Sequence, residues 1–211
     1  YGTPRTFRPS MGSPQGGVLS PLIWNLIVDE IITRIHGLGS IKIVAYADDL
    51  IILARGDHPP TIQGQLQLAL NLITRWGTEN NLTFNPDKTQ CILFTNKRKY
   101  EKPAALKINN TPLTLQNHIM YLGLHVEKSL SWHNHLKRQC TAAKRLLMTC
   151  RNAIGAEWGL TPARIKWIHE QIIRPKLAYG ACVWAFHLTK RDRKLLSSVQ
   201  RLSLLNMTSC M

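Results

Sequence analysis

Two adjacent acids, Asp48 and Asp49, separate two short, apolar, β-rich runs at 41–47 and 50–54. This pattern predicts a β-hairpin with the acids at its tip. A tight turn usually takes Asn-Gly or Asp-Gly because its backbone needs positive φ, and neighbouring carboxylates repel one another. A divalent cation such as Mg²⁺ or Mn²⁺ would explain the pair, because it is typically held by one or two carboxylates plus substrate phosphates. The alternative is an exposed turn that happens to carry acids, since Asp is common in turns.

The composition is that of a globular chain. It has 211 residues, of which 44% are apolar and 18% charged, enough for one large domain or two small ones. The most apolar run, 22–32, is interrupted by Asn25, Asp29 and Glu30, so nothing approaches the roughly 18 residues that cross a membrane. Because the sequence starts at Tyr1 without a methionine, we expect a piece of a longer product.

The cysteines and histidines predict no metal or disulfide framework. The five cysteines form no C-x-x-C pair and their number is odd, which argues against disulfides and zinc knuckles and favours a reducing, intracellular compartment. His133 and His135 could form a metal-binding pair, but no second pair matches them. We therefore interpret these two histidines as surface polarity.

The net charge of +15 is unevenly distributed. Residues 1–100 carry ten Lys/Arg against seven Asp/Glu, a net +3, whereas residues 101–211 carry seventeen against five, a net +12. From 128 to 201 there are fifteen basic residues and three acids. Such a surface attracts polyanions and suits phosphate backbones. The alternative is a basic surface that has no specific partner.

The periodicity predicts an order of elements in the first half of the chain. Ser20-Pro21 predicts a helix start, and isoleucines every four residues continue that helix to Gly37. The acid hairpin follows, then a helix over 60–76, then a strand pair around a type I turn at 85–88. This α-ββ-α-β order is a split βαβ unit without its first strand. We infer that the missing strand lies upstream of Tyr1.

The second half changes from strands to helices. We expect a short hairpin over 106–115 that turns near Asn109-Asn110, and one further strand over 119–126. Three helices should follow, at 132–154, at 161–186 with a kink at Pro175, and at 189–206. The expected fold class is therefore α+β, with a mixed part at 1–127 and a basic, all-helical part at 128–211.

A glycine-rich segment precedes the first predicted helix. Gly12, Gly16 and Gly17 would let the backbone approach a ligand closely, and the helix start presents free N–H groups. No Gly-Lys-[Ser/Thr] is present, so this is not a Walker loop. Alone it could be an ordinary loop. However, the helix that it opens should pack on the sheet that carries the acids, so that loop and acids could face one cleft.

Four motifs occur in the order found in reverse transcriptases. They are Gly-Ser-Pro-Gln-Gly-Gly-Val-Leu-Ser-Pro-Leu-Ile-Trp-Asn at 12–25, Ala-Tyr-Ala-Asp-Asp-Leu at 45–50, Leu-Thr-Phe-Asn-Pro-Asp-Lys-Thr at 82–89 and Tyr-Leu-Gly at 121–123. Over nearly its whole length, the chain most closely resembles the enzymes of non-long-terminal-repeat (LINE-like, jockey-type) retrotransposons. Group II intron reverse transcriptases share Pro-Gln-Gly and Tyr-Ala-Asp-Asp, but Leu-Ile-Trp-Asn is more like retrotransposon sequence.

The resemblance implies a partial palm at 1–127 and a helical thumb at 128–211. Asp48 and Asp49 would help hold two Mg²⁺ (or Mn²⁺) ions that activate the primer 3′-hydroxyl and neutralise the triphosphate. The implied partners are an RNA template, a DNA primer and dNTPs, and the implied location is cytoplasm and nucleus. The remaining implied roles are nucleotide or template binding by Pro14, Gln15, Gly16, Tyr46 and Lys88, and a primer grip of Tyr121, Leu122 and Gly123. Alternatives remain for Lys88, as an ordinary turn lysine, and for 121–123, as a plain core strand.

One departure from the family pattern bears on activity. The family takes a third carboxylate from the first palm strand, and Asp29 and Glu30 are poor substitutes because they fall on the predicted helix. We therefore expect this segment to be inactive alone, and poorly soluble because an apolar sheet edge is unpaired. Two interpretations remain, a reverse transcriptase segment or a decayed relic that at most binds nucleic acid; an RNA-dependent RNA polymerase is a third. The oligomeric state is left open.

Overall fold

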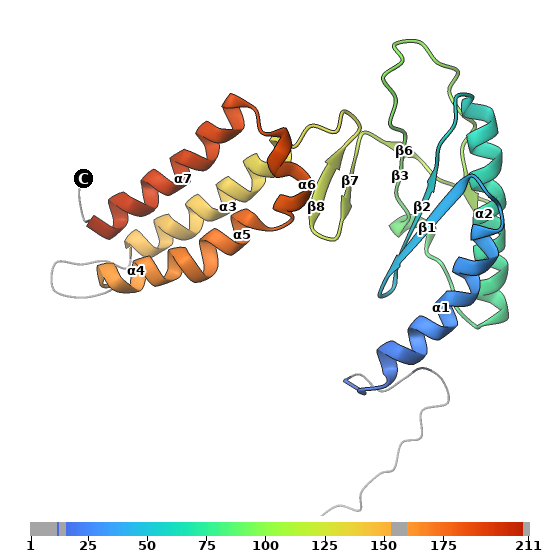
Figure 1. Ribbon diagram of the computed structural model, residues 1–211, viewed down its shortest axis with the longest axis horizontal. Helices are drawn as coiled ribbons and strands as arrows, with labels where there is room; N and C mark the ends of the chain where they lie inside the picture. Colours follow the sequence, from blue (N-terminus) through green and yellow to red (C-terminus); the bar gives the residue numbers. More distant parts are fainter. Residues whose placement is uncertain (1–11, 13–15, 153–159, 209–211) are drawn as a thin grey trace, which may run out of the picture. The chain divides into compact units, whose positions relative to one another are not determined.

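The computed structural model describes residues 12, 16–152 and 160–208, and the chain divides into two units (Figure 1). The first unit is Tyr1–Gln90 with Lys97–Thr114, and the second is Cys91–Asn96 with Leu115–Met211. Both contain helices and short strands, so the α+β class is confirmed. The palm and thumb division at residue 127 stays a prediction.

The first unit is built from two helices and a hairpin, in the predicted order. These elements are α1 (Ser20–His36), β1 (Ile41–Tyr46), β2 (Asp49–Ala54) and α2 (Pro59–Glu79). Alternation along β1 buries Ile41 and Ile43, and both lie in one core with Ile31 of α1 and with Ile73 and Trp76 of α2. The two helices therefore pack on the same face of the hairpin, and the opposite face is left open.

Helix α1 is buried in its C-terminal half and exposed in its N-terminal half. It begins at Ser20 after Leu19 as the N-cap, has proline in its first turn and ends before Gly37, close to the predicted bounds. Of the four isoleucines that predicted it, Ile31 and Ile35 are fully buried, whereas Ile23 and Ile27 are exposed. The N-terminal half of α1 thus presents an apolar surface to solvent.

The strand predicted before the Asn85 turn is absent. After α2 the chain doubles back, with Leu82 N donating to Gly77 O at 2.7 Å, and the side chains of Leu82 and Phe84 pack against the first core. These side chains are held by α2 and not by a partner strand, which explains why no strand forms. The turn itself is confirmed as a 3₁₀ segment, Pro86–Lys88, in which Asn85 Oδ1 accepts from Asp87 N at 2.8 Å.

The hairpin predicted around Asn109-Asn110 is confirmed. It consists of β4 (Lys107–Ile108) and β5 (Thr111–Pro112), and the two asparagines have φ of 49° and 64°. Asparagine tolerates this left-handed backbone better than most residues do. The hairpin lies against α2 in the first unit.

In the second unit, the prediction of a single strand over 119–126 is wrong. The chain forms a hairpin of β7 (His118–Tyr121) and β8 (Leu124–Glu127), with Tyr121 opposite Leu124. The two residues between the strands, Leu122 and Gly123, have φ of 44° and 76°, as the favoured two-residue hairpin turn requires. A second small sheet pairs β3 (Cys91–Ile92) in parallel with β6 (Leu115–Gln116).

The helices of this unit are α3 (His133–Asn152), α4 (Pro162–Ile168), α5 (Arg174–Ala178), α6 (Ala181–Trp184) and α7 (Lys190–Thr208). Buried Leu147 of α3 and Val199 of α7 belong to one core. In the described chain, no helix has the length and apolar character to span a membrane.

The prediction of one helix over 161–186 is also wrong, because the helical structure in this range is interrupted twice. A π-helical turn, His169–Ile173, comes just before Pro175, and the N–H of Arg174 bonds to His169 O five residues back. This turn absorbs the hydrogen bond that proline cannot donate. The second break is at Gly180, whose φ of 65° ends α5 and starts α6.

Candidate functional site

The acid pair lies at the hairpin turn, one residue away from the predicted register. Tyr46 pairs with Asp49, so the two-residue loop is Ala47-Asp48 and Asp49 is the first residue of β2. Ala47 has a φ of 51°, which costs a residue with a Cβ about 1–2 kcal/mol. Such strain persists only where the surrounding structure imposes it, and it is concentrated at functional sites.

A tryptophan from α1 holds this turn. Trp24 Nε1 donates to Ala47 O at 2.6 Å, and the half-buried indole packs against the first core. The segment that follows Gly16 and Gly17 is therefore attached to the acid turn through the second turn of its helix. Trp24 was not predicted as a site residue, although it stands in the Leu-Ile-Trp-Asn motif.

The carboxylates face solvent without partners. Asp49 and Tyr46 are directly opposite each other on the open face of the hairpin, since Ile41 and Ile43 occupy the other face. Asp48 and Asp49 are exposed, and neither makes a hydrogen bond or ion pair with the part of the chain that the structure describes. Two neighbouring carboxylates that no described cation engages offer oxygen ligands of the kind that Mg²⁺ or Mn²⁺ takes.

For the other predicted site residues of the first unit that lie in the described ranges, the structure shows no contact with the acid turn. Gly16 is exposed, with a φ of 84° that favours glycine, whereas Pro14 and Gln15 lie outside the described residues. Lys88 is exposed in the 3₁₀ segment, and its ammonium has no partner among residues 16–152 and 160–208. Glu30 is engaged elsewhere, by Arg34 at 2.6 Å, as expected of an acid on the helix.

The predicted primer grip belongs to the second unit. Tyr121, Leu122 and Gly123 end β7 and form its turn, which Tyr179 holds by donating its hydroxyl to Leu122 O at 2.8 Å. A Cβ on Gly123 would lie 3.2 Å from Cε1 of the same Tyr179 ring. Tyr179, 57 residues away from Leu122, had no sequence signal that linked it to this segment.

The interpretation of His133 and His135 as surface polarity is wrong. His135 is 2% exposed and lies between Trp132 and Trp184, while His133 Nδ1 is 2.7 Å from Oδ1 of the buried Asp192. These side chains join α3 to the elements around it. Within the described ranges, no three His, Cys, Asp or Glu side chains gather as a metal centre.

Asp192 closes the start of α7. Its carboxylate accepts from Thr189 N and Oγ1, at 3.0 and 2.6 Å, and Thr189 Oγ1 accepts in return from Asp192 N at 3.2 Å. Burial alone raises the pKa of Asp192, but the hydrogen bonds from Thr189 and His133 outweigh it and hold that pKa below its ordinary value. The reciprocal bonds form a capping box.

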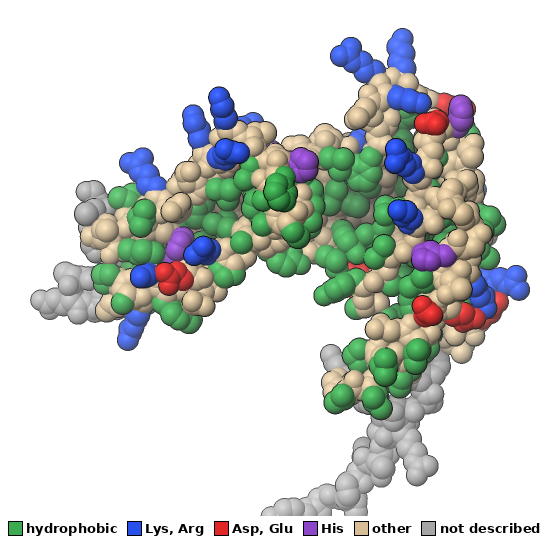
Figure 2. Space-filling view, viewed as in Figure 1, with side chains coloured by type: hydrophobic (Ala, Val, Ile, Leu, Met, Phe, Trp, Pro, Cys, Tyr) green, Lys and Arg blue, Asp and Glu red, His purple; other side chains and the backbone are tan. Residues whose placement is uncertain are grey.

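The helices of the second unit carry the predicted basic surface. Figure 2 shows Lys and Arg side chains projecting from them into solvent. On the described helices of this second unit, the one ion pair between a Lys or Arg and an acid is Lys166 with Glu170, at 3.9 Å. The exposed basic residues are Lys137, Arg138, Arg145, Arg164, Lys166, Arg174, Lys176, Lys190, Arg191, Arg193, Lys194 and Arg201. This surface is suited to a polyanion.

The family follows from comparison with known proteins. The family model described as "Reverse transcriptase (RNA-dependent DNA polymerase)" matches residues 2–126, more than half of the chain. The chain therefore belongs to the reverse transcriptase family, whose members are nucleotidyltransferases that use divalent metals and act on an RNA template and a DNA primer with dNTPs.

Within this family the chain is similar to the enzymes of non-LTR retrotransposons, as the motifs predicted. It is 24% identical over 179 residues to the Pol polyprotein of the type-1 retrotransposable element R1 2 of Nasonia vitripennis, covering 82% of this chain and 43% of that protein. A second R1 Pol polyprotein from the same organism is 24% identical over 195 residues, 90% of this chain and 58% of the relative. The RNA-directed DNA polymerase of the mobile element jockey from Drosophila funebris is 26% identical over 193 residues, 85% and 20% respectively. The chain thus spans less than two thirds of each of these relatives.

Proposed function

We propose that this chain is the palm and thumb segment of a retrotransposon reverse transcriptase that extends a DNA primer on an RNA template. The observation that carries the proposal is the acid turn, where Asp48 in a strained loop held by Trp24 and Asp49 next to it are exposed and have no partner among the residues that the structure describes. The strain would be costly for a turn whose only role is to connect two strands.

Asp48 and Asp49 are the proposed ligands of Mg²⁺ or Mn²⁺. Bound there, the ions would activate the primer hydroxyl and neutralise charge on the triphosphate. In this proposal the chain's own residues bind and orient the substrates: Pro14, Gln15, Gly16 and Tyr46 at the nucleotide and template base, and Lys88 at the triphosphate. Tyr121, Leu122 and Gly123 would hold the primer.

The proposal includes a third carboxylate from outside the hairpin. Val44 and Leu53 are each 49% exposed on the hairpin, and Leu22 and Leu26 on α1 are more so. Large apolar side chains exposed on both elements are a reason to expect that more polypeptide packs there, which supports a further palm strand with the missing acid. We therefore propose that the 211-residue chain alone does not extend primers, and that the longer product acts in cytoplasm and nucleus.

Primer extension on an RNA template tests the acid turn. In the longer product that contains this chain, Asp48→Asn and Asp49→Asn should each abolish dNTP incorporation without changing the unfolding temperature. Asp57→Asn is the matched control, because it removes the same charge from an exposed acid beyond the end of β2. Full extension by the Asp49→Asn variant contradicts the metal-ligand role, and metal-dependent extension by the 211-residue chain alone contradicts the need for a further acid.

The second candidate function is nucleic-acid binding by a relic without polymerase activity. The exposed basic helices of the second unit favour it, because they need no acid turn in order to bind phosphates. The reading frame upstream separates the two candidates. An open frame that encodes an apolar strand ending in Asp supports the enzyme, whereas a stop codon or frameshift supports the relic.

A further inference from the structure

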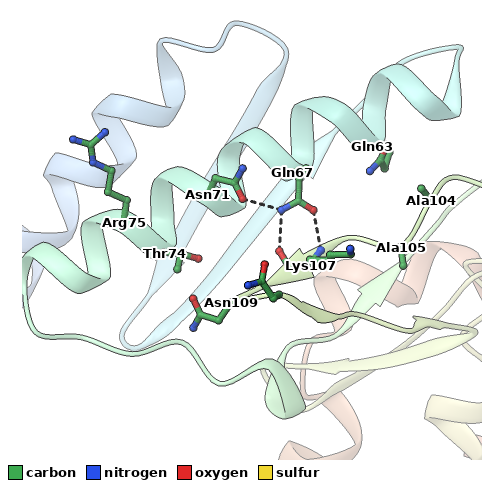
Figure 3. A pocket seen from close by; sticks show the side chains of 10 residues that line it. Gln63, Gln67, Asn71, Thr74, Arg75, Ala104, Ala105, Lys107 and Asn109 are labelled. Carbon is green, nitrogen blue, oxygen red and sulfur yellow. Dashed lines mark hydrogen bonds between the residues drawn. The ribbon is translucent and has the colours of Figure 1, made fainter.

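An open groove of about 600 Å³ lies in the first unit, between α2 and the β4–β5 hairpin (Figure 3). One wall presents the side-chain amides of Gln63, Gln67 and Asn71, four residues apart on α2 and hence on one helical face. The other wall includes Asn109 and Asn110, at the hairpin turn. Among the described residues that line the groove there is no carboxylate.

One of these amides fixes the two walls together. Gln67 Oε1 accepts from Lys107 N at 2.8 Å, and its Nε2 donates to Lys107 O and to Asn71 Oδ1, each at 2.9 Å (Figure 3). Gln67 thereby pairs with the backbone of β4 as a neighbouring strand would. The groove is therefore held in shape by the protein itself.

The other polar groups of the groove are available to a ligand. The amides of Gln63, Asn109 and Asn110 and the ammonium of Lys107 make no hydrogen bond with residues that the structure describes. Arg75 uses its Nε toward Glu79, which leaves its terminal nitrogens for other acceptors. The adjoining segment 97–102 adds four Lys/Arg against one Glu.

The groove is separate from the acid turn. Helix α2 packs on the hairpin through Ala69, Ile73 and Trp76, while the groove lies along a different face of the same helix, with Gln63 and Asn71. The acids are on the hairpin face that the helices do not cover. A ligand in the groove would therefore bind outside the proposed polymerase site.

We propose that this groove binds single-stranded RNA at a second site. Amide side chains both donate and accept, which matches the edges of bases and the 2′-hydroxyl, and those edges are open to side chains in single strands. Lys107 and Arg75 pair with phosphates, and the absence of lining carboxylates removes the repulsion that a polyanion would meet. Peptides are disfavoured because, among the residues that line the groove, only Ala104 and Ala105 have apolar side chains, and both are too small to anchor a peptide side chain.

Photocrosslinking tests the proposal with the intact chain and a fluorescent 12-nucleotide RNA that carries 4-thiouridine, in EDTA and without dNTPs. The variant is Gln63→Glu with Asn71→Asp, which keeps both shapes and the oxygen that accepts from Gln67 but adds two negative charges. The control, Thr61→Glu with Gln65→Glu, adds the same charges to α2 outside the groove lining. Circular dichroism checks that both variants fold.

The crosslinks should map to residues 63–75 and 104–110, and the groove variant should lose these crosslinks and weaken RNA binding about tenfold. The control should change the affinity less than about twofold, because its two charges lie outside the groove lining and are screened from the RNA at physiological salt. Crosslinks confined to residues 115–211, or equal affinity of the two variants, would overturn the proposal. Equal crosslinking of a DNA 12-mer would overturn the assignment to RNA. Neither measurement depends on primer extension.

Discussion

Replacing Gly77 by alanine separates two opposing effects at the end of α2. Alanine favours a helix over glycine by about 0.5–1 kcal/mol, so helix propensity alone predicts stabilisation. A Cβ at this position, however, would lie 2.8 Å from both Leu82 O and Phe84 Cε2. The first of these atoms is backbone, and Leu82 N is itself bonded to Gly77 O at 2.7 Å, so that segment cannot withdraw without losing its hydrogen bond.

We expect the destabilisation from the steric clash to exceed the stabilisation from helix propensity. Overpacking of this kind costs about 1–3 kcal/mol, and the loss of the Leu82 bond adds about 0.5–1.5 kcal/mol. After subtracting the gain in propensity, Gly77→Ala should lower the free energy of unfolding by about 0.5–4 kcal/mol. Gly64, on the same helix, has nothing within 4 Å of a would-be Cβ, so that Gly64→Ala should raise that free energy by about 0.5–1 kcal/mol.

Thermal unfolding followed by circular dichroism measures both changes. For a chain of this size about 1 kcal/mol corresponds to roughly 2–4 °C, so Gly77→Ala should lower Tm by several degrees while Gly64→Ala raises it slightly. If both variants raise Tm, the close packing of residues 82–84 on α2 is wrong. The comparison between two glycines of one helix cancels effects on the unfolded chain.

Further predictions concern the contacts that hold turns and helix ends. Trp24→Phe removes the indole donor to the acid turn and should lower stability by about 1 kcal/mol in urea unfolding and reduce primer extension by the longer product; unchanged extension contradicts its role. Asp192→Ala should cost about 2–3 kcal/mol because buried donors lose their acceptor, whereas a loss below about 0.5 kcal/mol contradicts the capping box. Burial lowers the pKa of His125 and His135 below the ordinary value of about 6.5. Their neutral forms therefore contribute fully to the free energy of unfolding above about pH 6.5, and this contribution is lost as the pH falls below that value. A constant Tm between pH 7.5 and 5.5 contradicts this.

The elements with a local signal were predictable from sequence. The isoleucines of α1 repeat every four residues, and the runs on either side of Asp48 alternate between two faces, because burial on one side imposes these periods. The position of the turn was predicted one residue too late. Ala47 takes the positive φ that sequence rules reserve for glycine or asparagine, and nothing near it in the sequence indicates that Trp24 supports this conformation.

The errors fall where distant residues decide the local structure. The run at 119–126 was predicted as one strand because its apolar residues hide a turn at Leu122-Gly123, which Tyr179 stabilises from another part of the chain. His135 was placed on the surface because a histidine alone has no burial preference strong enough to predict its site. Trp132 is a local neighbour, but Trp184 comes close to His135 only after α3 and α6 have packed.

The two turns that carry family motifs are stabilised in the same way. In each, a residue with a Cβ adopts a left-handed φ, 51° at Ala47 and 44° at Leu122, and its own carbonyl oxygen accepts a hydrogen bond from a distant aromatic side chain, Trp24 or Tyr179. One such bond contributes about 1 kcal/mol, comparable with the strain of about 1–2 kcal/mol that it opposes. Each turn therefore depends on its aromatic hydrogen bond to keep a strained backbone conformation. Loss of either aromatic donor should change the conformation of the turn before it affects the core. This arrangement suits the roles proposed for the two turns, because a turn stabilised only by its own sequence would relax to a less strained form.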